Sequence, residues 1–171
     1  GLVEEMGGTI DVISQPGQGA QFSICLPGAD RTATVPQHQD TELPRGKERI
    51  VLVDDEAEIA ATFRRLLLRL GYRVEAFTSS LVALEHIRSH PERPDVLISD
   101  MVMPDLGGEE LVNTVRELRP DMPVIICTGY NPAGMKINGP RPEMLHKPVD
   151  PAKLARTIRA MVDRNIKAQQ P

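Results

Sequence analysis

Short hydrophobic runs alternate with segments of helical spacing over most of the chain. Five runs are rich in apolar side chains: Ile50–Val53, Tyr72–Phe77, Val96–Ser99, Val124–Cys127 and Met144–His146. Runs this short, separated by helical patterns, are typical of parallel strands that are buried on both faces. The alternation of strand and helix therefore predicts an α/β fold, a doubly wound five-stranded parallel sheet covered by helices on both faces.

The spacing of apolar residues predicts a helix after each of the first two strands. The first helix ends at Gly71, because glycine suits the left-handed turn that closes many helices. The second covers about residues 79–90, and we expect Leu81, Leu84 and Ile87 on its inner face.

The rest of this region is less regular. A third helix is predicted at residues 108–118. Proline and glycine crowd the segment between Thr128 and Lys147, so its helix should be short or irregular. Asp150 is a suitable N-cap for the last helix. That helix should bury Leu154, Ile158 and Met161 and expose a solvated face of Lys153, Arg156 and Arg159.

The residues before the sheet pattern form two zones. Residues 1–27 contain the end of a helix and two alternating segments around a Pro-Gly turn, which predict a β-hairpin. Residues 28–48 are polar and without periodicity, as in a flexible linker. We therefore expect the α/β domain to cover residues 49–166, followed by a tail at residues 167–171.

Composition and charge narrow the range of functions. The 171 residues carry a formal net charge of −4, with no Trp and only 3% aromatic residues, which argues against a basic or base-stacking surface for nucleic acid. No apolar stretch is long enough to cross a membrane. Cys25 and Cys127 are not spaced as metal ligands. We expect a reducing, cytoplasmic setting and no contact of this chain with nucleic acid or membrane.

Four of the five strands stop at residues that phosphoryl chemistry uses: Asp54 and Asp55, Asp100, Thr128, and Lys147. In such sheets, ligands bind beyond the carboxyl ends of the strands. Crowded carboxylates repel one another unless a cation lies among them, and Mg²⁺ prefers oxygen ligands. Asp100 would then be a nucleophile that forms an aspartyl phosphate. Thr128 would donate its hydroxyl to a phosphate oxygen, and Lys147 would supply a positive charge.

Other interpretations of these residues stay open. Asp54 and Asp55 could simply favour the start of the following helix, and Asp100 could be a turn residue. The second candidate function is a phosphatase or mutase with an aspartyl nucleophile on a similar sheet. Such enzymes usually carry Asp-x-Asp after the first strand, whereas this chain has Asp54-Asp55-Glu56. The third candidate is an interaction module that is never phosphorylated.

Four motifs lie at these strand ends: Val51–Glu56, Asp100 with Met103-Pro104, Thr128-Gly129, and Lys147-Pro148. Through them, residues 49–166 resemble the receiver domain of two-component response regulators over the whole length of that domain. The resemblance implies a flavodoxin-like sheet of strand order 2-1-3-4-5. It also implies a cis bond between Lys147 and Pro148, which proline makes affordable.

The same resemblance implies a role for each site residue. Asp100 would accept a phosphoryl group from the phosphohistidine of a histidine kinase or a histidine phosphotransfer domain. Asp55, Asp100 and the backbone carbonyl of Val102 would bind Mg²⁺, and Asp54 would support the metal partly through water. Phosphorylation would draw Thr128 and Lys147 inward and change the surface formed by the fourth helix, the fifth strand and the fifth helix.

Three positions bear on how such a receiver would behave. Receivers usually have an aromatic residue three positions before the lysine, where this chain has Met144, and we expect that side chain to fill core space. Val102 and Tyr130 lack a group suited to orient an attacking water. We therefore predict slow loss of the phosphoryl group.

Residues 1–27 resemble the last helix and hairpin of a histidine-kinase ATP-binding domain, through Gly1–Ile10 and Pro16–Phe22. The resemblance implies a hybrid sensor histidine kinase as the parent protein, with this receiver at its C-terminus. The nucleotide-binding segments and the phosphorylated histidine would lie upstream, as would any membrane anchor. By itself, this chain would be a phosphoacceptor and would not use ATP.

Overall fold

A computed structural model of the chain describes residues 2–28, 42–89, 93–129 and 134–168. The chain divides into two compact units, Gly1–Thr41 and Glu42–Pro171. The second unit contains the whole predicted sheet, and the two units are described separately below.

The first unit contains a short helix and a β-hairpin. Helix α1 (Leu2–Glu5) precedes the antiparallel strands β1 (Thr9–Gln15) and β2 (Gly19–Cys25). The hairpin is the one predicted from sequence. Its register pairs Ile10 with Ile24 and Val12 with Phe22. All four of these apolar side chains are exposed.

The second unit is built on a five-stranded parallel sheet. Its strands are β3 (Arg49–Val53), β4 (Arg73–Phe77), β5 (Val96–Asp100), β6 (Val124–Thr128) and β7 (Glu143–His146). They lie in the order β4-β3-β5-β6-β7, which corresponds to the expected order 2-1-3-4-5. The predicted fold class is therefore confirmed.

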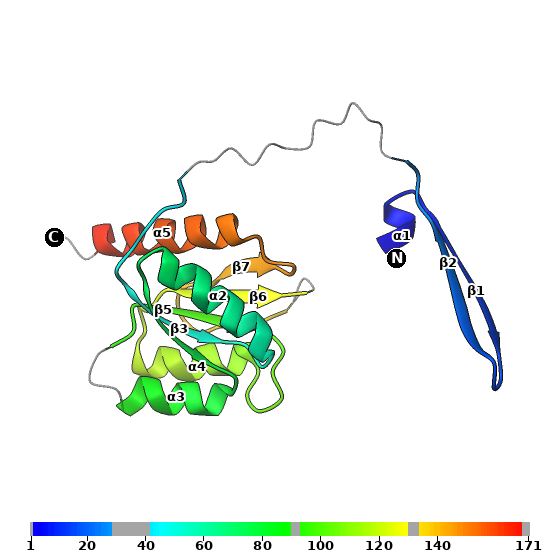
Figure 1. Cartoon of the computed structure of the whole chain (residues 1–171). Helices are drawn as coiled ribbons and strands as arrows, with labels where there is room; N and C mark the ends of the chain where they lie inside the picture. The colour runs from blue at the N-terminus through cyan, green and yellow to red at the C-terminus, as the bar shows by residue number, and fades with distance from the viewer. Residues whose placement is uncertain (1, 29–41, 90–92, 130–133, 169–171) are drawn as a thin grey trace. The chain divides into compact units, whose positions relative to one another are not determined.

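Four helices cover the sheet in two layers: α2 (Ala57–Arg69), α3 (Ser80–Ser89), α4 (Gly108–Leu118) and α5 (Pro151–Ala168). Helices α2 and α5 lie on one face, and α3 and α4 lie on the other (Figure 1). Side chains of a strand alternate between faces. Accordingly, Ile50 and Leu52 belong to the first core, while Val51 and Val53 belong to the second.

One predicted core position is wrong. Leu81 on α3 is 54% exposed, and the small residues Ser80 and Ala83 are buried instead. The hydroxyl of Ser80 accepts a hydrogen bond from the backbone N–H of Leu106 at 3.0 Å. Positions 80, 83, 84 and 87 share one helix face, which leaves Leu81 in solvent, and the hydrogen bond gives the buried hydroxyl of Ser80 the partner that it needs.

The connection between β6 and β7 contains no helix in its described part, residues 134–142. Helix α4 holds this segment through side chains. Asn113 donates to the carbonyl of Lys136 at 2.9 Å and accepts from the N–H of Asn138 at 2.8 Å. The buried guanidinium of Arg116 donates to the carbonyls of Pro120 at 2.6 Å and Pro140 at 2.9 Å. The described part of the surface expected around a fourth helix consists of β7, α5 and the irregular residues 134–142.

The α/β unit begins before residue 49. Leu43 packs against the first core, and the N–H of Gly46 donates to the carbonyl of Leu70 at 3.1 Å. Glu48 pairs with Arg159 of α5 at 2.9 Å. The expectation of a solvated Arg159 is therefore wrong, because that side chain fixes the entering chain to the last helix. Lys153 and Arg156 are exposed, as expected.

The ends of two helices follow the sequence signals. Gly71 has a φ of 95°, which a residue with a side chain rarely adopts. A Cβ atom there would also lie 2.8 Å from the carbonyl oxygen of Gly46. At the start of α5, a carboxylate oxygen of Asp150 accepts the N–H of Ala152 at 2.7 Å. Both the predicted helix end and the predicted N-cap are present.

Candidate functional site

The polar residues predicted at the strand ends lie together at one edge of the sheet. Asp54 and Asp55 follow β3, Asp100 ends β5, Thr128 ends β6 and Lys147 follows β7. One carboxylate oxygen from each of the three aspartates lies within 4.8 Å of the other two. Asp54 and Asp100 are buried, whereas Asp55 is exposed. The edge is thus an acidic pocket that is open on the side of Asp55.

Lys147 supplies the positive charge of this pocket. Its Nζ lies 3.1 Å from Asp100 Oδ1, 3.3 Å from Asp54 Oδ2 and 3.9 Å from Glu56 Oε1. The backbone N–H of Lys147 donates to the carbonyl of Thr128 at 2.8 Å, so β6 positions this lysine. The bond between Lys147 and Pro148 is cis, as the sequence resemblance implied.

The protonation equilibria of the pocket reflect its burial and its charges. Burial raises the pKa of Asp54, and the nearby charge of Asp100 adds to this effect. The N–H of Glu56, at 3.0 Å, and the ammonium of Lys147 offset only part of the increase. For Lys147, burial lowers the pKa, but its contacts with Asp100 and Asp54 outweigh this and leave the pKa raised. Asp54 and Asp100 therefore share one ammonium group, which does not balance the negative charge of the three neighbouring carboxylates.

This donor set fits a hard divalent cation. All three acidic groups offer oxygen atoms, which Mg²⁺ prefers, and the exposed Asp55 leaves room for the water that Mg²⁺ usually retains. A second cation would also relieve the repulsion among three neighbouring carboxylates.

The loop after Asp100 is fixed by its backbone. The N–H of Met101 donates to the carbonyl of Cys127 at 2.9 Å, and the N–H of Gly108 donates to the carbonyl of Met101 at the same distance. A Cβ atom on Gly108 would lie 2.5 Å from the carbonyl oxygen of Asp100, closer than side chains approach backbone. Glycine at this position lets α4 begin directly against the strand end that carries Asp100.

Three further positions, Val102, Met144 and Tyr130, bear on the behaviour predicted for this site. Val102 is 62% exposed, two positions after Asp100. Met144 is partly buried and packs against the second core, so its predicted core-filling role is confirmed. Tyr130 lies outside the described residues.

Sequence reasoning missed two features next to Lys147. Glu56 approaches the ammonium, and only its position after the acidic pair could have indicated this. A largely apolar hollow of about 650 Å³ also adjoins Lys147 and is lined by Ile59, Phe63 and Val149, among others. The helical pattern of α2 does not distinguish a residue in the core from one that lines a hollow.

Comparison with known proteins identifies the family. The model of the response regulator receiver domain family matches residues 50–159. The chain belongs to this family. A receiver domain protein from Clostridium thermocellum is 30% identical, with a TM-score of 0.64 over 71% of this chain and 99% of that structure. A CheY-like receiver from Methanospirillum hungatei JF-1 is 28% identical, with a TM-score of 0.63 over 72% of this chain and 99% of that structure.

Curated relatives include longer proteins. The sensor kinase CckA of Brucella abortus (strain 2308) is 29% identical over 96% of this chain and 19% of the kinase. The response regulator MprA of Mycobacterium ulcerans (strain Agy99) is 33% identical over 68% of this chain and 50% of the regulator. The chain thus spans half or less of the length of these two relatives.

Family membership places the chain in two-component signal transduction. Receiver domains generally bind Mg²⁺ in an acidic pocket and exchange phosphoryl groups with histidine kinases or phosphotransfer proteins. The matches do not favour the phosphatase or mutase interpretation. Within the described residues, no helix combines the length and apolar character needed to cross a membrane.

Proposed function

We propose that this receiver accepts a phosphoryl group on Asp100 from a phosphohistidine, with Mg²⁺ bound in the acidic pocket. The observation that carries the proposal is the convergence of three carboxylates on one strand edge, with Lys147 Nζ 3.1 Å from Asp100. Phosphoryl transfer depends mainly on positioning and on charge neutralisation, and this pocket supplies groups for both.

The reaction uses Asp100 as the nucleophile. A carboxylate oxygen of Asp100 forms a bond to phosphorus while the bond between phosphorus and one imidazole nitrogen breaks. The released electron pair stays on that nitrogen, and because the other ring nitrogen carries a proton, the histidine leaves as neutral imidazole. Asp54, Asp55, Asp100 and the carbonyl of Val102 would hold the metal ion. When bound, Mg²⁺ would neutralise the charge of the phosphoryl oxygens.

Thr128 and Lys147 bind the product. The Thr128 hydroxyl donates to one phosphoryl oxygen, and the Lys147 ammonium pairs with another. Lys147 now contacts Asp54 and Asp100, so phosphorylation changes the partners of a residue that links β7 to α5. We infer that the surface of β7, α5 and residues 134–142 responds as a shift between two populated states.

The phosphodonor is a histidine kinase or a histidine phosphotransfer domain. Its histidine has to reach the buried Asp100 from the side of the pocket where Asp55 is exposed. The apolar hollow of about 650 Å³ adjoins Lys147 on the side of α2 and suits the apolar face of a helix that carries the histidine.

The parent protein in this proposal is a hybrid sensor histidine kinase in the cytoplasm. The match to CckA covers 96% of the chain and thus extends well beyond the receiver. The hairpin also exposes apolar side chains, including Val12 and Phe22, that the body of an ATP-binding domain would cover. Residues 1–27 would be the end of that domain, joined by a linker within residues 28–48 to the receiver and its tail at residues 167–171.

Intact mass spectrometry tests the acceptor residue. The chain is incubated with acetyl phosphate and Mg²⁺, beside Asp100→Asn and the control Asp105→Asn, which changes an exposed carboxylate of the following loop. We expect an adduct of one phosphate on the native chain and on the control, and none on Asp100→Asn or after chelation of Mg²⁺. An adduct that persists on Asp100→Asn would refute the assignment.

A further inference from the structure

A second cavity lies at the opposite edge of the sheet from Asp100. Its volume is about 480 Å³, within the usual range of small-molecule sites. Glu48, Asp95 and Pro123 line it, and they directly precede β3, β5 and β6. The end of α4 and the last turns of α5 form the other walls. The cavity therefore shares no residue with the proposed phosphorylation site.

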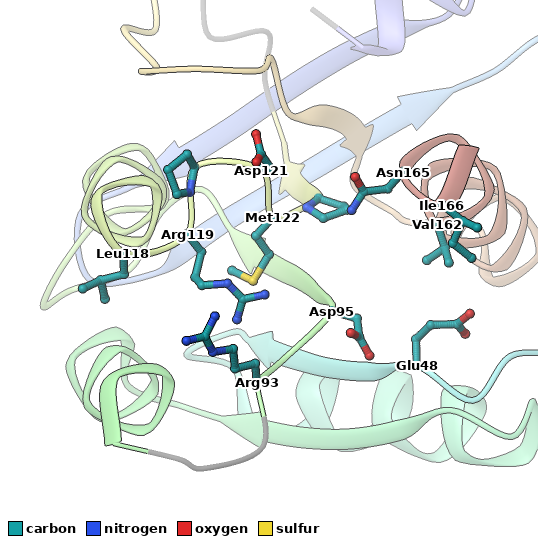
Figure 2. A pocket seen from close by; sticks show the side chains of 12 residues that line it. Glu48, Arg93, Asp95, Leu118, Arg119, Asp121, Met122, Val162, Asn165 and Ile166 are labelled. Carbon is teal, nitrogen blue, oxygen red and sulfur yellow. The ribbon is translucent and has the colours of Figure 1, made fainter. Parts of the chain in front are cut away.

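Two arginines point into this cavity. The guanidinium groups of Arg93 and Arg119 face each other closely across it (Figure 2). Within the part of the chain that the structure describes, neither side chain has a carboxylate within 4.0 Å. Two like charges in this arrangement repel each other. An anion between the two guanidinium groups would attract both of them and offset this repulsion.

Three carboxylates also line the cavity. Glu48 pairs with Arg159 at 2.9 Å. Asp95 Oδ2 accepts the backbone N–H of Arg49 at 2.8 Å. The carboxylate of Asp121 points away from the two facing guanidinium groups (Figure 2). The two guanidinium groups therefore face each other without forming an ion pair to any of these three carboxylates.

Part of the remaining lining is aliphatic, beside the polar Asn165. Met122 lies beside Arg119 and is buried, whereas Leu118 and Ile166 at the rim are 43% and 47% exposed. Among the described residues, no aromatic side chain lines the cavity, so this lining offers no stacking platform for a nucleobase. The aliphatic rim beside the paired guanidinium groups suits an anion that carries a small apolar body.

We propose that this cavity binds a small phosphate monoester. Its dianionic phosphate lies between Arg93 and Arg119, because guanidinium groups bind phosphate through paired hydrogen bonds. Its organic part contacts the aliphatic rim of Leu118 and Ile166. Such a ligand would bind independently of phosphorylation at Asp100, since the two sites lie at opposite ends of the strands.

Titration with phenyl phosphate tests this site. The full chain is studied without Mg²⁺, by calorimetry for the dissociation constant and by ¹⁵N-resolved NMR for the location. We expect saturable shifts around Arg93, Arg119 and Met122, and weaker binding of inorganic phosphate, which lacks the apolar body. Arg93→Gln and Arg119→Gln should each weaken binding about tenfold, as loss of a charge-assisted hydrogen bond does.

The control is Arg64→Gln, which removes the same charge from an exposed position on α2. It should leave the dissociation constant unchanged. Three outcomes would overturn the proposal: no saturable binding at millimolar phenyl phosphate, shifts centred on Lys147, or equal weakening by the control variant. The last outcome would mean that net charge alone attracts the anion.

Discussion

At the scale of residues, Lys147 is the positively charged group in contact with the carboxylates of the pocket. Its ammonium contacts both Asp54 and Asp100, so it partly neutralises the acidic pocket. A bound divalent cation and this ammonium would draw on the same carboxylate oxygens and would repel each other. Metal binding would therefore loosen the hold of the aspartates on Lys147, and a phosphoryl group on Asp100 would give the lysine a new anionic partner.

Val102 provides a prediction about the lifetime of the phosphoryl group. Its side chain is apolar and 62% exposed, two positions after the acceptor, so it cannot orient a water molecule for attack on the acyl phosphate. Val102→Asn should shorten the lifetime severalfold, because a carboxamide can hold that water. The decay of the phosphorylated mass after removal of acetyl phosphate measures it. Val102→Leu, which keeps an apolar side chain, is the control, and an unchanged or longer lifetime in Val102→Asn would contradict the prediction.

From the sequence alone, we could predict that the acidic residues lie together, but not the position of every side chain. Asp54, Asp100 and Thr128 each end an apolar run, and parallel strands must bring such ends to one edge. The pairing of Glu48 with Arg159 joins residues 111 positions apart, and no local pattern encodes it. Leu81 lies three positions before Leu84, but the buried face of α3 begins at Ser80, a polar residue that a hydrophobic pattern does not select.

At the scale of elements, side chains of α4 hold residues 134–142, which contain no helix. Prolines and glycines between Thr128 and Lys147 predict a short or irregular helix, but they do not indicate what holds the segment. Asn113 bonds to Lys136 and Asn138, and Arg116 donates to the carbonyl of Pro140 as well as to that of Pro120. Because burial lowers the pKa of Arg116, its charge is costly in the fold unless those carbonyls compensate.

Replacement of Arg116 should show how much the fold depends on this support. Arg116→Met fills similar space but leaves the carbonyls of Pro120 and Pro140 without their donor, which should lower the free energy of unfolding by about 2–4 kcal/mol. Urea unfolding measures the change. Arg88→Met, at an exposed position on α3, should change stability by less than about 0.5 kcal/mol. Equal stability of both variants would mean that the segment is held by other contacts.

At the scale of the whole molecule, the sequence predicts a hairpin and an α/β domain that begins at residue 49, whereas the compact unit that contains the sheet begins at Glu42. The polar composition of residues 28–48 is that of a linker, but side chains within its described end, residues 42–48, make contacts with this unit. Leu43 packs against the core and Glu48 reaches α5. These contacts depend on the position of α5, which follows more than a hundred residues later in the chain.

Truncation at two positions tests where the receiver begins. A chain of residues 42–171 should unfold at the same urea concentration as the α/β unit of the full chain, because it keeps every contact of that unit. A chain of residues 49–171 should be less stable by about 2 kcal/mol, since it loses the packing of Leu43, the hydrogen bond of Gly46 to Leu70 and the partner of Arg159. Glu48→Gln in the longer chain isolates the contribution of the ion pair. Equal stability of the two truncated chains would contradict this prediction. Residues 42–48 would then belong to the linker, and the stability of the receiver would not depend on how the preceding unit is attached.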